Sequence, residues 1–167
     1  MTGPLPDLDI YTAAELGNVE DVRYFIEEKK VAVTQYSNGR TALHLAAWKN
    51  PRLDVLNLLI AQGANVNALN HANQTPLHLA AAGNPNPDIL KYLIIQGADI
   101  HAKADDGSTP LHLASERNPN AAVLKLLIDQ GVDVNAKADD GATALDNAGT
   151  EEKQKILRDA GGKATWR

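Results

Sequence analysis

Apolar residues recur along the chain in two alternating patterns that predict pairs of helices. The first is a compact run such as Thr75-Pro76-Leu77-His78-Leu79-Ala80-Ala81. Thr is a preferred helix N-cap and Pro suits the first helical position, so this run predicts a short helix. The second pattern places apolar residues one, four and five positions apart, which gathers them on one broad helix face. It is formed by Ile89, Leu90, Leu93 and Ile94.

Both patterns return at a fixed interval of 34 residues. The four copies open with Thr41, Thr75, Thr109 and Thr143. A constant interval in this range indicates a stack of like units, each of which supplies part of its neighbour's core. An earlier, degenerate unit is indicated by Ala13-Ala14, which lies 33 residues before Ala46-Ala47.

Turn residues separate the predicted helices at equivalent places in each unit. Asn-Gly, Asp-Gly or Asn alone marks the loop between units, where a positive φ is expected. An Asn-Pro turn separates the two helices of a unit, because Pro ends the first helix. Gly follows the second helix as its C-terminal cap. These positions are Asn38-Gly39, Asn73 and Asp106-Gly107; Asn50, Asn84 and Asn118; and Gly63, Gly97 and Gly131.

This spacing divides the chain into five stacked repeats between two tails. We expect an N-terminal tail (1–7), the repeat domain (8–162) and a C-terminal tail (163–167) that contains Trp166. The repeats are 8–40, which serves as the N-terminal cap, then 41–74, 75–108 and 109–142, and last 143–162, the C-terminal cap. The second helix of this last repeat is expected to be about one turn shorter than the others. Both caps carry a charged outer face, which a terminal repeat needs for solubility.

The repeated pattern resembles the ankyrin repeat, over about residues 8 to 162. The resemblance rests on Asp-Gly-Ser-Thr-Pro-Leu-His-Leu-Ala (106–114) and Ile-Ile-Gln-Gly-Ala-Asp-Ile-His-Ala-Lys (94–103). It implies an all-α solenoid of helix-turn-helix pairs with projecting β-hairpin loops. It also implies a protein-binding scaffold without chemistry of its own. The period of 34 exceeds the usual 33 by one residue in the Asn-Pro turn, a feature similar to bacterial ankyrin proteins.

The composition of the chain argues against several classes of function. The chain carries a net charge of -5, which argues against nucleic acid as a partner, since phosphate binding needs a basic surface. There is no cysteine, so disulfides, thiolate zinc sites and cysteine nucleophiles are excluded. No apolar run reaches the ~18 residues of a membrane helix, and no secretory signal is visible at the start. We therefore expect a cytoplasmic monomer.

One histidine recurs in each full repeat, as His44, His78 and His112. Stacked helices lie ~10 Å apart, whereas zinc ligands must approach one ion to ~2.1 Å, so these residues cannot share a metal. We expect each imidazole to hydrogen-bond the backbone and to fix loop against helix. Asp146 replaces the histidine in the last repeat, which indicates loss of that contact. His101 stands where Asn67 and Asn135 stand in other repeats, and is expected to hydrogen-bond within its hairpin.

No catalytic or cofactor motif is present, so we expect no enzyme, no metal and no cofactor. The acidic pairs Asp105-Asp106 and Asp139-Asp140 lie in equivalent loops and are interpreted as turn formers.

The candidate binding residues are those that vary between repeats at the loop tips and at the end of the first helix. Architecture needs the repeated residues but does not dictate the variable ones. The candidates are Tyr36, Ser37, Arg40, Trp48, Lys49, His71, Gln74, Asp105, Ser108, Glu116, Arg117 and Asp139. Trp48 leads this set, because exposed Trp, Tyr and Arg are the usual binding hot spots. The alternative is that Trp48 packs over Tyr36 or Lys49.

These residues predict a surface that changes from aromatic and basic to acidic along the concave face. The main hypothesis is a scaffold that binds a protein or peptide there. The alternatives are a secreted bacterial effector and a regulatory subunit that masks an enzyme or transcription factor.

Overall fold

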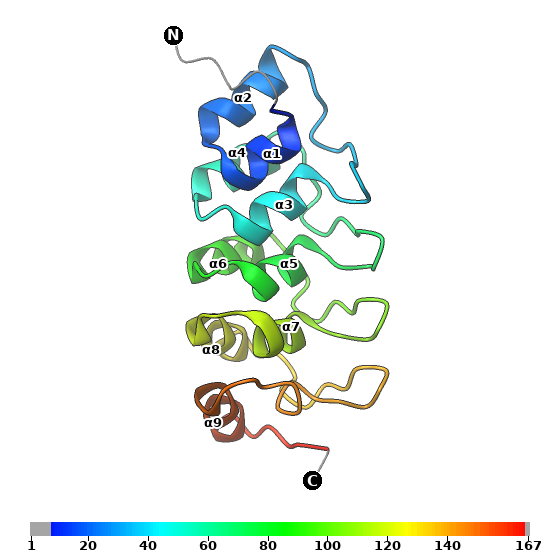
Figure 1. The fold of residues 1–167 in the computed structure, drawn as a ribbon, viewed down its shortest axis with the longest axis vertical. Coiled ribbons are helices and arrows are strands. Elements are labelled where there is room, and N and C mark those ends of the chain that lie inside the picture. Colours follow the sequence, from blue (N-terminus) through cyan, green and yellow to red (C-terminus); the bar gives the residue numbers. More distant parts are fainter. Residues whose placement is uncertain (1–7, 166–167) are drawn as a thin grey trace.

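The computed structural model describes residues 8–165, which form a single stack of helix pairs (Figure 1). The pairs are α1 (Ile10–Leu16) with α2 (Val19–Glu27), α3 (Ala42–Lys49) with α4 (Leu53–Ala61), α5 (Pro76–Gly83) with α6 (Pro87–Ile95), and α7 (Pro110–Arg117) with α8 (Ala121–Asp129); α9 (Glu151–Asp159) closes the stack. Residues 8–165 contain no extended strand, so the all-α prediction is confirmed.

Loops project from the same side of every helix pair (Figure 1). Each is closed by a backbone hydrogen bond, from Ala104 N to Ser108 O at 2.9 Å and from Ala138 N to Ala142 O at 3.0 Å in the later ones. The expected turn conformations are present: Asn73 has φ +52°, because Asn tolerates the left-handed region better than most residues. The hairpin character of the loops therefore follows from their turn residues.

The core is aliphatic and runs through the middle of the stack. The second-helix pattern that the sequence predicted is buried, with Leu56, Leu90 and Leu124 fully inaccessible at equivalent positions. Small alanines such as Ala46 and Ala80 are also fully buried on the first helices. Each pair thus buries its apolar face against its neighbours, as expected for a repeat stack.

The recurring histidines join each first helix to the loop that precedes the next pair. In His78 the Nδ1 atom accepts from the Thr75 backbone N–H at 3.2 Å, and this fixes the proton on Nε2. Nε2 then donates to the Ser108 carbonyl at 3.1 Å. His44 and His112 do the same with Gln74 and Ala142. The predicted structural role is confirmed, and within residues 8–165 no cluster of side chains could hold a metal ion.

Buried asparagines join each pair to the pair before it, a role that the sequence did not reveal. Asn84 is fully buried, and its Nδ2 donates to Ala47 O at 3.0 Å and to Asn50 O at 2.9 Å. The Ala47 carbonyl needs this donor because the residue four positions later is Pro51, which has no N–H. Asn50 and Asn118 make the equivalent bonds. The proline of the Asn-Pro turn thus removes a donor that the next pair restores.

At the end of the stack, Lys153 donates the hydrogen bond that a buried asparagine donates in the other pairs. It is only 6% exposed, and its Nζ donates to the Ser115 carbonyl at 2.9 Å. Ser115 again lies four residues before a proline, Pro119. Burial lowers the pKa of Lys153, since desolvation penalises the charged form.

The last repeat departs from its prediction. Its second helix, α9, has nine residues, as do α4, α6 and α8, so the expected shortening of this helix is wrong. The first helix is lost instead: residues 144–147 form only a turn. Three residues of low helix propensity stand here: Asp146 in place of His, Asn147 in place of Leu, and Gly149 in place of Ala or Ser.

The sequence indicated that the histidine contact is lost at Asp146, but Asp146 makes other contacts in its place. Its carboxylate accepts from the Thr143 N–H at 2.8 Å, and also from the N–H of Thr165. Burial raises the pKa of Asp146, but hydrogen bonds from Thr143 and Thr165 more than offset this and lower it. Residues 163–165, predicted to be tail, are therefore bonded to the last two repeats, through Asn135 and Asp146; Trp166 lies outside the described residues.

Candidate protein-binding groove

Three adjoining hollows lie between the loops and the first helices, and together we call them the loop–helix groove. The N-terminal hollow, of about 260 Å³, is lined by Asp9, Tyr11, Thr12, Glu15, Ser37, Asn38, Arg40 and Leu45. The central hollow, of about 310 Å³, is lined by Arg40, Trp48, Gln74, Leu79, Ala82, Leu113 and Arg117. The C-terminal hollow, of about 410 Å³, is lined by Asp106, Ser108, Glu116, Arg117, Ala138, Asp139, Asp140 and Asn147. Arg40 and Arg117 each border two hollows, which makes the groove continuous.

The central hollow is built by three successive helix pairs. Arg40 and Trp48 come from α3 and its preceding loop, whereas Arg117 is the last residue of α7. Between them, Leu79 and Leu113 present apolar surface while remaining only 7% and 3% exposed. The hollow therefore has apolar walls with a guanidinium contributed by each of the outer pairs.

The indole of Trp48 has a fixed support. A Cβ atom added at Gly83 would overlap Cδ1 and Nε1 of the ring, so the indole lies directly on the backbone of α5. Other pairs have Lys49 or Arg117 where α5 has Gly83, and such side chains would block this position. Trp48 is thus half-buried and held by packing, which lowers the entropy lost when an aromatic residue contacts a partner.

Two cations lie near this ring. Lys49 Nζ is 4.2 Å and Arg40 Cζ is 5.4 Å from the ring centroid, within cation–π range. Lys49 also forms an ion pair with Glu15 of the neighbouring pair. No carboxylate within residues 8–165 forms an ion pair with Arg40, so its guanidinium is available to a partner.

The C-terminal hollow is acidic. The Ser108 N–H donates to Asp106 Oδ1 at 2.9 Å, and the Ala142 N–H donates to Asp140 Oδ1 at 2.9 Å. The hydrogen bond from Ser108 lowers the pKa of Asp106, which favours its charged form. These carboxylates close turns, as their sequence pattern predicts, and they leave a negative surface at this end of the groove.

Most of the candidate residues lie in this groove. Ser37, Arg40, Trp48, Gln74, Ser108, Glu116, Arg117 and Asp139 line its hollows. The structure thus brings together residues from four repeats, and their part in binding stays a prediction.

Four candidates lie outside the hollows. Tyr36 is 54% exposed, and Lys49 lies over Trp48. His71 and Asp105 occupy equivalent loop tips but contact the preceding loop. The His71 ring lies against Gly39, where a Cβ atom would overlap it, and Asp105 accepts from the Asn73 amide. These two side chains connect successive loops and are not free tips.

The sequence interpretation missed the apolar lining of the groove. Leu45, Leu79 and Leu113 repeat in register, a pattern that indicates a structural role. The equivalent residue in the last repeat is Asn147, which also lines the groove. A polar replacement at a repeated apolar position was therefore the available signal that this position faces the surface.

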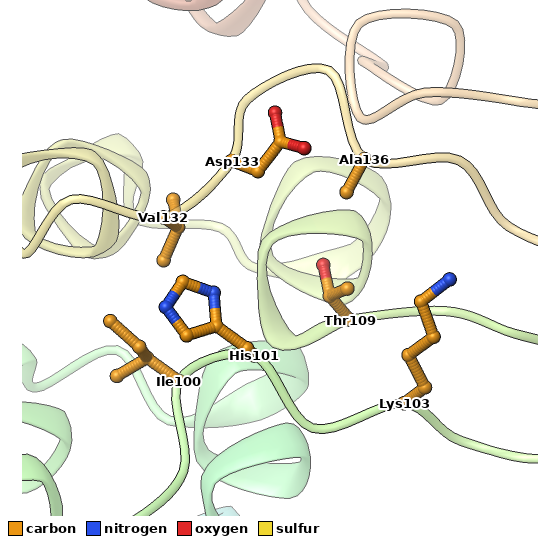
Figure 2. A pocket seen from close by; sticks show the side chains of 7 residues that line it. All are labelled: Ile100, His101, Lys103, Thr109, Val132, Asp133 and Ala136. Atoms are coloured by element: carbon orange, nitrogen blue, oxygen red, sulfur yellow. The ribbon is translucent and has the colours of Figure 1, made fainter.

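A separate hollow of about 190 Å³ surrounds His101 but holds no reactive cluster. Asn67 Nδ2 donates to Gly97 O at 3.0 Å and Asn135 makes the equivalent bond, yet the His101 imidazole forms no hydrogen bond within residues 8–165. Figure 2 shows this imidazole between Ile100 and Val132, with the Asp133 carboxylate pointing away from it. His101 does hydrogen-bond within its loop, through its backbone N–H to Asp99 Oδ1 at 2.8 Å. Its imidazole does not replace the amide bonds of Asn67 and Asn135, because it does not have the acceptor and donor spacing of an amide.

Comparison with known proteins agrees with this geometry. A model of ankyrin repeats in three copies matches residues 10–70 and 77–159, and a second ankyrin model matches residues 49–94. The chain belongs to the ankyrin repeat family. Ankyrin repeats are generally protein–protein interaction modules, which points to protein partners. Within the described residues, no helix combines the length and the apolar character needed to cross a membrane.

This ankyrin chain is also similar to a much longer protein. It is 46% identical over 63 residues to alpha-latroinsectotoxin-Lt1a of Latrodectus tredecimguttatus. That region is 37% of this chain and 4% of the toxin, so the chain spans a small part of this relative. The match concerns the repeats and does not bear on the bacterial origin expected from the Asn-Pro turns.

Proposed function

We propose that this chain is a non-enzymatic module that binds a protein or peptide along the loop–helix groove. The observation that carries the proposal is the central hollow, where Trp48 rests on Gly83 beside the unpaired Arg40. An aromatic side chain held at the surface next to Arg is the residue combination that dominates binding energy at protein interfaces.

The chemistry of the groove supports binding over catalysis. Two of its carboxylates, those of Asp106 and Asp140, accept hydrogen bonds from backbone N–H groups of their own turns. The recurring histidines are buried, and both ring nitrogens are used in structural hydrogen bonds. A histidine that acts as general acid or base needs a free ring nitrogen near its substrate, and these histidines do not offer one.

Two replacements in the central hollow test the proposal. The double variant Arg40→Ala/Trp48→Ala should lose the partner proteins that the unchanged chain retains in a parallel pull-down. Its melting temperature should fall by less than ~3 °C, since neither side chain belongs to the core. Lys91→Ala/Lys125→Ala is the control, because both lysines are exposed on the second helices, away from the groove. Equal retention of partners by the two double variants would refute the site.

Gly83→Ala gives an independent test that leaves the groove charges intact. The added methyl should displace the Trp48 indole, which intrinsic fluorescence would report as a shift in emission. Partner retention should fall together with that shift. Full retention despite a displaced indole would show that Trp48 is not a contact.

Several biological roles fit this groove. The chain would mask an enzyme or transcription factor as a cytoplasmic regulatory subunit, or bind a host protein as an exported bacterial effector. These roles differ in partner and compartment, not in the surface used.

A further inference from the structure

The charges of the loop–helix groove alternate along its length. The N-terminal hollow contains the carboxylates of Asp9 and Glu15. The central hollow contains the guanidinium groups of Arg40 and Arg117. The C-terminal hollow contains four carboxylates, those of Asp106, Glu116, Asp139 and Asp140. A partner that lies along the groove must meet these charges in order.

The central hollow favours an apolar side chain with negative charge beside it. Leu79, Leu113 and the Trp48 indole offer apolar contact, and Ala82 leaves room because it ends at Cβ. Arg40 has no ion-pair partner within residues 8–165, and the one partner of Arg117 is its exposed neighbour Glu116. A carboxylate from a bound segment can therefore pair with either guanidinium without first displacing a buried partner.

The C-terminal hollow favours positive charge on the same segment. The carboxylates of Asp106 and Asp140 are held in place by turn hydrogen bonds, so these two cannot move apart to relieve repulsion. Successive helix pairs lie ~10 Å apart and an extended chain advances ~3.3 Å per residue. The acidic hollow lies one to two pairs beyond the central hollow, which corresponds to about three to six residues of an extended segment.

We propose that the groove binds an extended segment of a partner protein in which an apolar residue flanked by carboxylates is separated by about three to six residues from basic residues. This inference rests on the proposed function and adds the chemistry of the partner. Charge complementarity of this kind sets which segment binds and its register more than the affinity.

The test is selection from a displayed library of random peptides of about ten residues, the length that spans three helix pairs. The unchanged chain should enrich peptides with an acidic–apolar–acidic core and basic residues on one side. Arg40→Glu/Arg117→Glu should reverse the preference around the apolar residue from acidic to basic. Lys91→Glu/Lys125→Glu makes the same change in net charge on the second helices, and should leave the enriched set unchanged.

The affinity of one enriched peptide measures how much a single guanidinium contributes to binding. Arg117→Gln should weaken its binding by about tenfold, the expected effect of one charge-assisted hydrogen bond. Binding should also weaken as salt rises, because the charges of the groove are partly exposed. Circular dichroism of each variant confirms that the fold is retained before binding is compared.

The outcomes separate this inference from the function on which it rests. Enriched peptides that require Trp48 but show no acidic preference near the apolar residue would overturn the inference and leave the groove as the binding site. Enrichment that Trp48→Ala does not reduce, or no enrichment at all, would count against both.

Discussion

Replacing Asn84 with Ala should test whether the buried asparagines hold the helix pairs together. Asn84 Nδ2 donates to the carbonyls of Ala47 and Asn50, and its Oδ1 accepts from the Asn86 N–H at 3.0 Å. The change removes all three hydrogen bonds. It also leaves the Ala47 carbonyl without a donor, because Pro51 has no N–H to offer it.

The expected loss of stability is large for one polar side chain. Asn84, Ala47 and Asn50 are all fully buried, so water cannot replace the missing donor without opening the stack. A buried group left unsatisfied costs ~1–3 kcal/mol, and two carbonyls are affected. We therefore expect Asn84→Ala to lower the free energy of unfolding by ~2–6 kcal/mol, against a total of ~5–15 kcal/mol for a typical domain.

Urea denaturation followed by circular dichroism measures this loss. Asn86→Ala is the matched control, since its side chain also makes two hydrogen bonds, to Pro51 O and from the Asp88 N–H, but both are exposed. Loss of this helix cap should cost only ~1 kcal/mol. An Asn84 variant no less stable than the Asn86 variant, at equal dependence on urea, would refute the argument from unsatisfied carbonyls.

Two further predictions concern the core. Burial lowers the pKa of His44 and His78, so below about pH 6.5 the unfolded chain binds protons that the folded chain does not. The free energy of unfolding should therefore stay constant above that pH and fall on acidification. A urea midpoint that is higher at pH 5 than at pH 7 would contradict this. Leu93→Ala, in the middle of the stack and fully buried, should cost ~2–5 kcal/mol. Ile156→Ala, at the half-buried end, should cost less, and calorimetry that found the reverse order would contradict this.

The sequence was sufficient for the repeated parts of the fold. The Thr cap, the positive φ at Asn73 and the contact of His78 Nδ1 with Thr75 all depend on a residue and its near neighbours in the chain, which the period displays directly. The last repeat was harder, because its first helix is lost through an accumulation of weak helix formers. No single residue there, Asp146 included, forbids a helix.

Contacts between pairs were not visible in the sequence. Asn84 was recognised as a turn residue, yet its carbonyl partners lie 34 and 37 positions earlier. Trp48 is a candidate from the sequence because it does not repeat, but Gly83, which makes room for its indole, is 35 residues away. A repeat pattern shows which positions are equivalent, and only the packed stack shows which of them touch.

The hydrogen bonds between pairs also determine how such a chain can lengthen or shorten. Each of the three full pairs gives one asparagine to the pair before it and one histidine to the loop after it, and the central pair, α5–α6, also receives both. Duplication or deletion of one 34-residue unit from the interior therefore leaves every donor matched to an acceptor. The final repeat lacks this interchangeability, because Lys153 and Asp146 replace the two shared residues. We therefore expect whole interior units to be added or removed without loss of these hydrogen bonds, whereas the last repeat fits only at the end of the stack.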